Sequence, residues 1–426
     1  MSVSTLSVFL DHTRVGHVTR ADGPSRFRYD PEYLASEKFI PVSLSFRSTP
    51  APQSQRVTQA WMQGILPANE QARATIARRA GARPTDLLGL LAEVGLDCPG
   101  AVRLCRPEDE SALVERSDDL RPMSDDAIAD RLAVMAEAGD TWIIPGDESW
   151  SLGGAQSKFT LTRRGDAWYR PLGGAASTHV VKEGAPGIRL QALNEHVCLS
   201  ALRQIGMETV RSDYREFGGR PAILVERFDR LRGADGTLHR LHQEDLCQAL
   251  ARVSAYERRG GPTVQVISQL LRSQVGEESN QRFVEALIAN YALGAPDGHA
   301  RNYSILLLPG SRAVLAPLYD VASALPYRVT DQQGGRLVMR EVAMNIGGER
   351  RFGFVQRPHW LKLFATCQVD PEWGFSRVAG IAEALPGAVS QALAEVSMPA
   401  SDQLAERFLP ALEHHCRLIG DKPSTA

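Results

Sequence analysis

Three residues in the second half of the chain carry side chains that suit a divalent metal beside phosphate groups. Asp297 and Asn302 begin and end the stretch Asp-Gly-His-Ala-Arg-Asn, and Asp320 follows an apolar run farther along. Two carboxylates and an amide supply hard oxygen ligands, which suit Mg²⁺ bound together with nucleotide phosphates. These residue types predict metal-assisted chemistry on a phosphate-bearing molecule.

A helix and a hairpin should bring these residues together. Helical spacing over residues 281–293 stops before a Gly-Ala-Pro sequence, so the stretch that starts at Asp-Gly-His should lie in a loop. Residues 303–318 contain two apolar runs around a Pro-Gly turn, which predicts an antiparallel hairpin. Folding about that turn would place Asn302 roughly opposite Tyr319, and therefore beside Asp320.

The order of these residues matches the phosphate-transfer site of protein kinases. That site uses a loop aspartate, an asparagine five residues later and a distant metal-binding aspartate. Upstream, Lys182 ends an apolar strand, where its ammonium group would neutralise ATP phosphates, and the helical Glu195 would hold it. The usual kinase words HRD and DFG are missing, since the last aspartate stands in Tyr-Asp-Val. Together the residues predict a site for ATP and Mg²⁺.

Each of these residues also has an ordinary structural explanation. Asp297 in Pro-Asp-Gly suits a turn, Asn302 could cap the hairpin, and Asp320 could simply end a strand. Lysines at strand ends are usually solvated, and helical glutamates usually face water. Only the shared spacing of the set favours phosphate transfer over these alternatives.

A glycine pair lies upstream, in the sequence SLGGAQSK at residues 151–158. Gly153, Gly154 and Ala155 leave backbone N–H groups free to approach phosphates, which is a favourable environment for anions. Taken alone, the pair fits an ordinary turn equally well.

The hydrophobic pattern divides the chain into three parts. We expect a small N-terminal β/α subdomain at residues 1–106, a sheet-rich nucleotide-binding lobe at 107–235 and a mainly helical catalytic lobe at 236–426. A length of 426 residues is enough for a core in each of two or three such parts.

Local patterns predict the main elements of the first two parts. Residues 5–19 should form a hairpin, and 56–97 should be helical. The charged segment between 106 and 126 suggests a connection rather than core. Residues 151–182 should form strands separated by glycine turns, and 188–205 should form a helix that ends at a glycine.

Composition narrows the classes of partner and compartment. The net charge is -2, with 48 Lys+Arg against 50 Asp+Glu, so any contact with DNA is expected to come mainly through a partner. The six cysteines are scattered without a CxxC pair, which predicts reduced thiols and a cytoplasmic location. No stretch of about 18 apolar residues indicates membrane insertion or export.

The sequence resembles the HipA family of persistence kinases. The segments that resemble the hallmark words of this family are SLGGAQSK, HVVK, NEH, LVERFDR, HQEDLCQA, DGHARNYS and PLYDVASALP. RFRYDPEYLA, PVSLSF, GILPANEQAR and LAEVGLDCPGAVRL are similar to the short domain that precedes the kinase body. The resemblance covers nearly the whole chain. It implies an α+β, two-lobed protein-kinase-like fold with a small N-terminal β/α subdomain.

Carried over position by position, the resemblance implies that Asp297 is the catalytic aspartate and that Asn302 and Asp320 bind magnesium. Glu226 and Phe228 would meet adenine through the segment that links the lobes. The full nucleotide site implied in this way consists of Gly153, Gly154, Ala155, Gln156, Ser157, Lys158, Lys182, Glu226, Phe228, Gln243, His299, Asn302 and Asp320.

The resemblance also implies a regulatory serine. Ser151 matches the residue that family members autophosphorylate, a change that ejects the phosphate loop and silences the kinase. Ser157 stands where the family word has Glu, and Arg301 replaces a Lys in the catalytic loop. These two departures leave substrate choice and loop regulation open, because neither removes a catalytic group.

The function implied by the resemblance is that of a serine/threonine protein kinase that acts as a toxin. Its target would be an aminoacyl-tRNA synthetase, and its regulator would be a helix-turn-helix antitoxin of the HipB type, which would supply the DNA contact. Two alternatives are a non-catalytic kinase-fold corepressor and a kinase for a small molecule. Intact Asp297, Asn302, Asp320 and Lys182 argue against the first, and Ser151 argues against the second.

Overall fold

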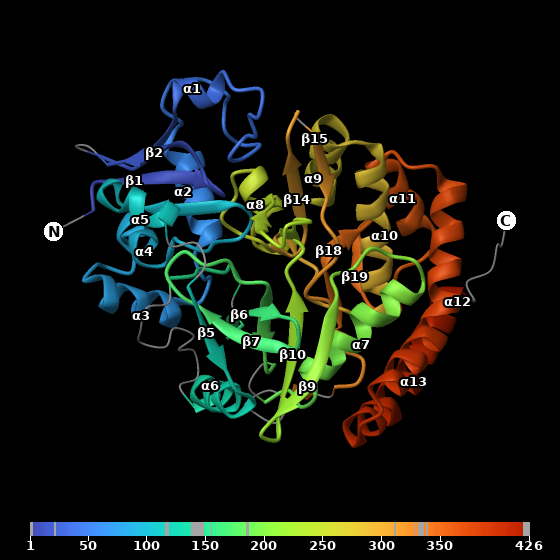
Figure 1. Ribbon diagram of the computed structural model, residues 1–426. Helices are drawn as coiled ribbons and strands as arrows, with labels where there is room; N and C mark the ends of the chain where they lie inside the picture. The colour runs from blue at the N-terminus through green and yellow to red at the C-terminus, as the bar shows by residue number, and fades with distance from the viewer. Residues whose placement is uncertain are drawn as a thin grey trace.

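A computed structural model shows the N-terminal unit beside a central sheet, with long C-terminal helices on the far side of the molecule (Figure 1). The structure describes residues 3–20, 23–115, 119–137, 149–154, 156–184, 187–310, 312–327, 329–330, 336–337 and 340–420. No helix in this described part is both long enough and apolar enough to cross a membrane.

The N-terminal unit combines an antiparallel sheet with short helices. Its strands are β1 (Thr5–Leu10), β2 (Thr13–Thr19), β3 (Arg26–Tyr29) and β4 (Val102–Cys105), in the order β3-β2-β1-β4. Its helices are α1 (Pro31–Leu34), α2 (Gln55–Ile65), α3 (Glu70–Ala80) and α4 (Leu87–Val94). The predicted hairpin at 5–19 is confirmed, and so is the helical character of 56–97.

The central sheet has six strands in the order β5-β7-β6-β8-β10-β9. The strands are β5 (Leu120–Met123), β6 (Phe159–Arg164), β7 (Ala167–Pro171), β8 (His179–Lys182), β9 (Ser212–Phe217) and β10 (Arg220–Glu226). Neighbouring strands are antiparallel, as the glycine turns between them predict. Helix α7 (Gln191–Gln204) ends before Gly206, which has a left-handed φ of 86°, in agreement with the predicted helix end.

The segment from 106 to 126 contains more structure than the expected connection. It forms η1 (Pro107–Asp109), α5 (Glu110–Glu115), the edge strand β5 and the start of α6 (Asp125–Glu137). Arg121 and Pro122 in β5 are exposed, and an edge strand tolerates both a charged residue and a proline. The charge of this segment therefore reflects an edge position and not the absence of structure.

The third part is mainly helical, with a three-stranded sheet, β13-β14-β15, beside the loop at residues 297–302. Its elements are β11 (Arg230–Arg232), β12 (Leu238–Arg240), β13 (His242–Asp245), α8 (Leu246–Ala249), η2 (Glu257–Arg259), α9 (Val264–Leu270), η3 (Leu271–Val275), α10 (Glu277–Leu293), η4 (Ala300–Asn302), β14 (Ser304–Leu308), β15 (Arg312–Leu315), β16 (Val329–Thr330), β17 (Arg336–Leu337), β18 (Glu341–Ile346), β19 (Glu349–Arg351), α11 (Arg357–Cys367), α12 (Pro371–Val396) and α13 (Pro399–Gly420). The helices α12 and α13 pack along each other and against α7 and α10 (Figure 1).

The predicted hairpin forms, but it is shorter than expected. Ile305 pairs with Leu315, and β14 also pairs with β13 on its other side. Leu318 leaves the hairpin and forms a parallel bridge with Thr209, so Asn302 has no cross-strand partner near Tyr319. The Tyr319 hydroxyl nevertheless lies beside this loop, since it donates to the backbone oxygen of Arg301 at 2.7 Å.

The two faces of the central sheet pack against different parts of the chain. Val181 and Leu224 belong to a core shared with the N-terminal unit, whereas Ile223 and Val225 belong to a core shared with α7 and the helical lobe. Because Ile223 pairs with Lys182 and side chains alternate along a strand, Lys182 lies on the α7 face. The sheet thereby directs its one buried lysine toward the helical lobe.

All six cysteines are buried and none forms a disulfide. They are Cys98, Cys105, Cys198, Cys247, Cys367 and Cys416. Burial raises the pKa of each thiol, as for Cys198, whose pKa rises to about 12. The thiols are therefore protonated packing groups.

Candidate nucleotide and phosphate-transfer site

Lys182 lies at the centre of a buried ion cluster. Its Nζ atom lies 2.9 Å from Oε1 of Glu195 and 2.7 Å from Oδ1 of Asp320. Strand β8 supplies the lysine, α7 supplies the glutamate, and the segment after β15 supplies the aspartate. The side chains of Lys182 and Glu195 are 7% and 3% exposed, whereas that of Asp320 is 35% exposed. Asp320 is thus the member of the cluster that reaches solvent.

The charges of the cluster are set by burial and by neighbouring groups. Burial alone would raise the pKa of Asp320, but Lys182 and Lys158 lower this pKa to about 2. Burial raises the pKa of Glu195, and the charge of Asp320 adds to this effect while Lys182 opposes it. Asp320 is therefore ionised at neutral pH, as a carboxylate ligand of Mg²⁺ must be.

Asn194, the neighbour of Glu195 on α7, holds the chain beyond Asp320. Its Nδ2 donates to the backbone oxygen of Ser323 at 2.7 Å, and its Oδ1 accepts from the Ser323 N–H at 3.1 Å. Asp320 itself is left-handed, with φ of 59°, a conformation that costs roughly 1–2 kcal/mol for a residue with a Cβ. Asn194 thus anchors the chain three residues beyond Asp320, and its neighbour Glu195 contacts Lys182, the ion-pair partner of Asp320.

The loop at residues 297–302 is held by hydrogen bonds to Asp297. Nδ2 of Asn302 donates to the backbone oxygen of Asp297 at 2.7 Å, and the Tyr256 hydroxyl donates to Oδ1 of its carboxylate. Partial burial raises the pKa of Asp297, the charge of His299 and the hydrogen bond from Tyr256 oppose this shift, and the nearby charge of Asp320 adds to it. Since 57% of its side chain is exposed, this carboxylate is accessible as well as held.

The glycine loop lies between the N-terminal unit and the ion cluster. The backbone oxygen of Gly154 accepts from the Ala68 N–H at 2.9 Å, and that of Gly153 accepts from Nζ of Lys158 at 2.8 Å. Burial lowers the pKa of Lys158 to about 8, and the charge of Lys182 acts in the same direction. The loop thus brings a second ammonium group near the first. Ala155, predicted to belong to the loop, lies outside the described residues.

Ser151 is buried at the start of this loop. Its side chain donates to the backbone oxygen of Ile65 at 2.8 Å, and its surface is 1% exposed. Its N–H also donates to the backbone oxygen of Asp97 at 3.0 Å. In this conformation the Ser151 hydroxyl is buried and cannot reach a phosphoryl donor.

The predicted adenine contacts lie in the segment after β10. Glu226 pairs with His179, so its side chain lies on the face of the sheet opposite to Lys182. The Phe228 ring stacks on Tyr319, with centroids 5.6 Å apart and planes at 23°. Phe228 therefore connects the segment between the lobes to the residue that precedes Asp320.

Three predicted nucleotide-site residues carry buried polar atoms without a protein partner in the described part of the chain. These atoms are Nε2 of Gln156, Oε1 of Gln243 and Nδ1 of His299. Buried polar groups are nearly always satisfied in proteins, so such atoms fit a polar ligand. Together with the ionised Asp320 and two lysines, they suit ATP and Mg²⁺. Ser157, the remaining predicted member, is partly buried beside Lys158.

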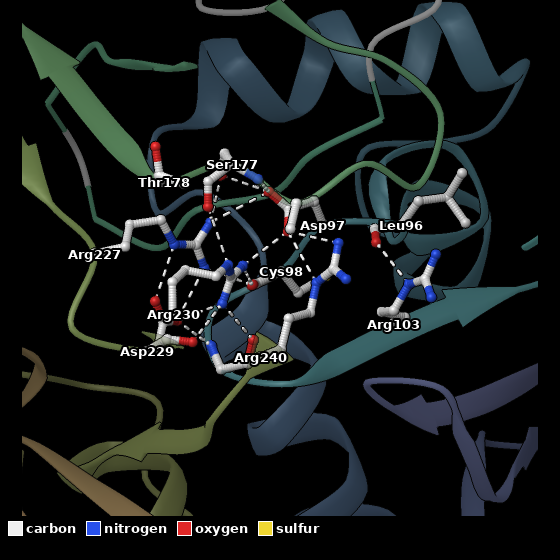
Figure 2. Close-up of polar contacts among 12 residues, drawn as sticks. Leu96, Asp97, Cys98, Arg103, Ser177, Thr178, Arg227, Asp229, Arg230 and Arg240 are labelled. Atoms are coloured by element: carbon white, nitrogen blue, oxygen red, sulfur yellow. Dashed lines mark hydrogen bonds and ion pairs between the residues drawn. The ribbon is translucent and has the colours of Figure 1, made fainter. Parts of the chain in front are cut away.

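A second ion cluster joins the N-terminal unit to the segment between the lobes (Figure 2). Asp97 accepts from Arg230 at 2.7 Å, from Arg227 at 3.3 Å and from Arg240 at 3.3 Å. Asp229 pairs with Arg227 at 2.9 Å and accepts from the Gly100 N–H at 2.6 Å. Burial alone would raise the pKa of Asp97, but its three guanidinium partners hold it well below the ordinary value.

Several residues of the site were not predicted. Tyr256 carries no motif and lies far from the catalytic loop in sequence. Asn194 and Asp245 stand inside the segments NEH and HQEDLCQA, which resemble family words but were not assigned a role. Asp245 caps α8 by accepting from the Gln248 N–H at 2.9 Å. Asn194 and Asp245 could have been identified only by examining each residue of NEH and HQEDLCQA separately.

Comparisons with known proteins agree with this architecture. Residues 150–393 match the HipA-like C-terminal domain, and residues 6–105 match the HipA N-terminal domain. Y4mE of Sinorhizobium fredii, a kinase by name, is 32% identical over 334 residues, which are 77% of this chain and 79% of that protein. The serine/threonine-protein kinase toxin HipA of Shewanella oneidensis is 28% identical over 272 residues, or 59% of this chain and 60% of that protein.

A solved structure shows the same fold. HipA in the toxin–antitoxin complex of HipA, HipB and operator DNA from Shewanella oneidensis superposes with a TM-score of 0.81 at 20% identity, covering 97% of this chain and 96% of that chain. The match confirms the expected α+β, kinase-like architecture. With both family domains matched in order, the chain belongs to the HipA family of kinases.

Proposed function

We propose that this protein transfers the γ-phosphoryl group of ATP to a serine or threonine of a protein, and that it acts as the toxin of a toxin–antitoxin pair. The observation that carries the proposal is the ion cluster in which Lys182 contacts both Glu195 and Asp320. Kinases hold the phosphate-binding lysine by a helical glutamate in this way. Stability alone does not explain why the Asp320 side chain is solvent-exposed while Lys182 and Glu195 are buried.

The residues divide the chemistry among themselves. Lys182 and Lys158 would contact phosphate oxygens, and Asn302 and Asp320 would hold Mg²⁺, which supplies charge neutralisation when bound. The Asp297 carboxylate would orient the acceptor hydroxyl and accept its proton. Gln156, Gln243 and His299 would satisfy their unpaired atoms on the nucleotide, and the backbone of Glu226 and Phe228 would meet adenine.

Ser151 would be the site of self-inactivation. Its hydroxyl is buried against Ile65, so phosphorylation requires residues 149–154 to leave their place beside the N-terminal unit. A phosphate carries a charge of nearly -2, which could not return to that buried position. Modification at Ser151 would therefore keep the glycine loop away from the nucleotide.

The partners follow from the family. We propose a helix-turn-helix antitoxin of the HipB type, which would make most of the DNA contact, and an aminoacyl-tRNA synthetase as the protein substrate. Both would be met in the cytoplasm, which suits a chain whose cysteines are all unpaired.

The test is incubation of the purified chain with Mg²⁺ and ATP radiolabelled in the γ-phosphate, followed by mapping of labelled residues. Label on Ser151 that disappears in Ser151→Ala and Asp297→Asn, but not in the exposed control Asp235→Asn, is the expected result. ATP binding without label on the chain or on added synthetases would contradict the proposal and favour the non-catalytic corepressor. Turnover stimulated only by a metabolite would favour the small-molecule kinase.

A further inference from the structure

A short segment far from the catalytic loop in sequence is attached to that loop along its length. Residues 253–257 run beside it, and the backbone oxygen of Val253 accepts from Nη2 of Arg301 at 2.9 Å. The backbone oxygen of Ala255 accepts from the Ala300 N–H at 3.3 Å. The backbone of the segment is therefore bound by the loop at two points, once by the Arg301 side chain and once by the Ala300 N–H.

Tyr256 occupies the middle of this segment and reaches the carboxylate of Asp297. Its hydroxyl donates to Oδ1, and its ring meets the edge of the His299 ring with centroids 4.6 Å apart and planes at 82°. The guanidinium groups of Arg259 and Arg258 lie 5.3 and 5.9 Å from the centre of the same ring. The ring is thus held from several sides, so the hydroxyl has a defined direction.

We propose that Tyr256 is a positioning residue for phosphoryl transfer, whose hydroxyl fixes one oxygen of Asp297 so that the other oxygen faces the acceptor hydroxyl. This inference rests on the proposed role of Asp297. Asn302 holds the backbone of Asp297 at 2.7 Å, but it leaves rotation of the carboxylate free. Tyr256 supplies the missing constraint, and a correctly oriented base is a large part of what an enzyme contributes to such a step.

The surroundings keep the phenol in its donating form. Burial raises the pKa of Tyr256, and the charge of Asp297 raises it further, while Arg259 and Arg258 oppose the shift. The hydroxyl therefore retains its proton and donates it in a hydrogen bond, without taking part in the transfer itself. The charge-assisted type of this bond belongs to the stronger class of hydrogen bonds in proteins.

The segment does not depend on this hydroxyl for its fold. Oε2 of Glu257 accepts from the Asn345 N–H at 2.7 Å and lies 3.2 Å from Nη2 of Arg350. Removal of the hydroxyl by Tyr256→Phe should therefore leave the backbone and ring in place. The variant tests the bond to Asp297 and not the integrity of the loop.

The experiment compares the full-length wild-type chain with Tyr256→Phe, Tyr214→Phe and Asp297→Asn, by rates of γ-phosphoryl transfer at varied ATP concentration. Tyr214 is the matched control, because its buried hydroxyl has no partner in the described part of the chain. We expect Tyr256→Phe to lower kcat about 10- to 100-fold, the range for a hydrogen bond to a charged group, with KM for ATP unchanged. Tyr214→Phe should match the wild type.

The outcomes separate this inference from the proposed function. An unchanged kcat for Tyr256→Phe, or a raised KM for ATP with kcat intact, would overturn the positioning role while leaving the kinase in place. A wild-type chain without transfer activity would instead contradict the proposed function. In that case, crystal structures of wild type and Tyr256→Phe decide: an Asp297 carboxylate that turns away in the variant supports positioning, and one that keeps its orientation overturns it.

Discussion

Two buried ion clusters of this protein use similar groups in opposite ways. The carboxylate of Asp97 is 2% exposed, accepts from three guanidinium groups and also from the side chain and N–H of Ser177. The carboxylate of Asp320 has an ion pair of the same length, 2.7 Å, with Lys182, yet remains 35% exposed. A saturated cluster has nothing left to bind, whereas an open one can accept a metal ion. Exposure and unfilled bonding capacity, more than charge, distinguish the cluster proposed to bind phosphate and metal from the structural one.

The largest expected effect comes from breaking the saturated cluster. Asp97→Asn leaves three buried guanidinium groups without their shared carboxylate, and we expect it to lower the free energy of unfolding by about 3–5 kcal/mol. Urea unfolding followed by circular dichroism measures this. The control Asp213→Asn removes an exposed carboxylate 3.6 Å from Arg163 and should cost less than about 0.5 kcal/mol. Equal costs for the two variants would mean that burial does not distinguish these pairs.

Breaking the open cluster should affect catalysis more than stability. Lys182→Met removes the ammonium group that would stabilise charge on the transferred phosphate, and we expect phosphoryl transfer to fall about 100- to 1000-fold. Transfer of label from ATP measures it, with the exposed Lys38→Met as control. If Lys182→Met retained near-normal transfer, Lys158 would be the more important lysine.

A third buried carboxylate sharpens the comparison, because it has no guanidinium partner among the described contacts. Glu244 accepts from the Leu44 N–H at 2.6 Å, and burial raises its pKa from 4.5 to about 8. The folded state thus binds this proton more tightly than the unfolded state. The contribution of Glu244 to stability should be complete below the ordinary pKa and should be lost, at about 1.4 kcal/mol per pH unit, as the pH rises from there toward 8.

Urea midpoints across this pH range measure the dependence on Glu244. Glu244→Gln should abolish it, because the amide resembles the protonated acid and does not titrate. The exposed Glu216→Gln should keep it. A dependence that survived Glu244→Gln would have to come from other groups, and Glu244 would then be ionised in the folded protein.

The smallest expected effect concerns the support of Lys182. Glu195→Gln keeps a hydrogen-bond acceptor at 2.9 Å from the ammonium group but removes its charge. We expect transfer to fall about tenfold, the equivalent of one hydrogen bond to a charged group. Steady-state rates at saturating ATP measure it. A loss as large as that of Lys182→Met would show that Asp320 alone cannot hold the lysine.

The sequence permitted a prediction of what depends on local pattern. The hairpin at 5–19, helix α7 and the loop between α10 and β14 follow from periodicity and from glycine and proline positions, and these elements bring Asp297 and Asp320 into one region. The edge strand β5 was missed because its exposed residues carry no alternating apolar signal. The end of the hairpin was misplaced because Leu318 pairs with Thr209, a contact between distant segments.

Contacts between distant segments also explain the residues that no pattern indicated. Asp97 and Arg227 meet across 130 positions, and Tyr256 and Asp297 meet across 41. A lone tyrosine or aspartate carries no sequence signal for such a meeting, since its role exists only after the parts have packed. The candidate site residues could be proposed from their spacing, but the groups that contact them, such as Tyr256, could not.

Because every cysteine is buried, the folded protein should react slowly with thiol reagents. Thiolates, not thiols, react with alkylating agents, and the folded chain keeps all six thiols protonated and covered. A maleimide should therefore modify the chain only when it unfolds locally or globally. The rate of labelling would then report the rate or extent of unfolding. By the same property, one cysteine introduced on the surface would be the single reactive handle for a fluorescent reporter of loop movement.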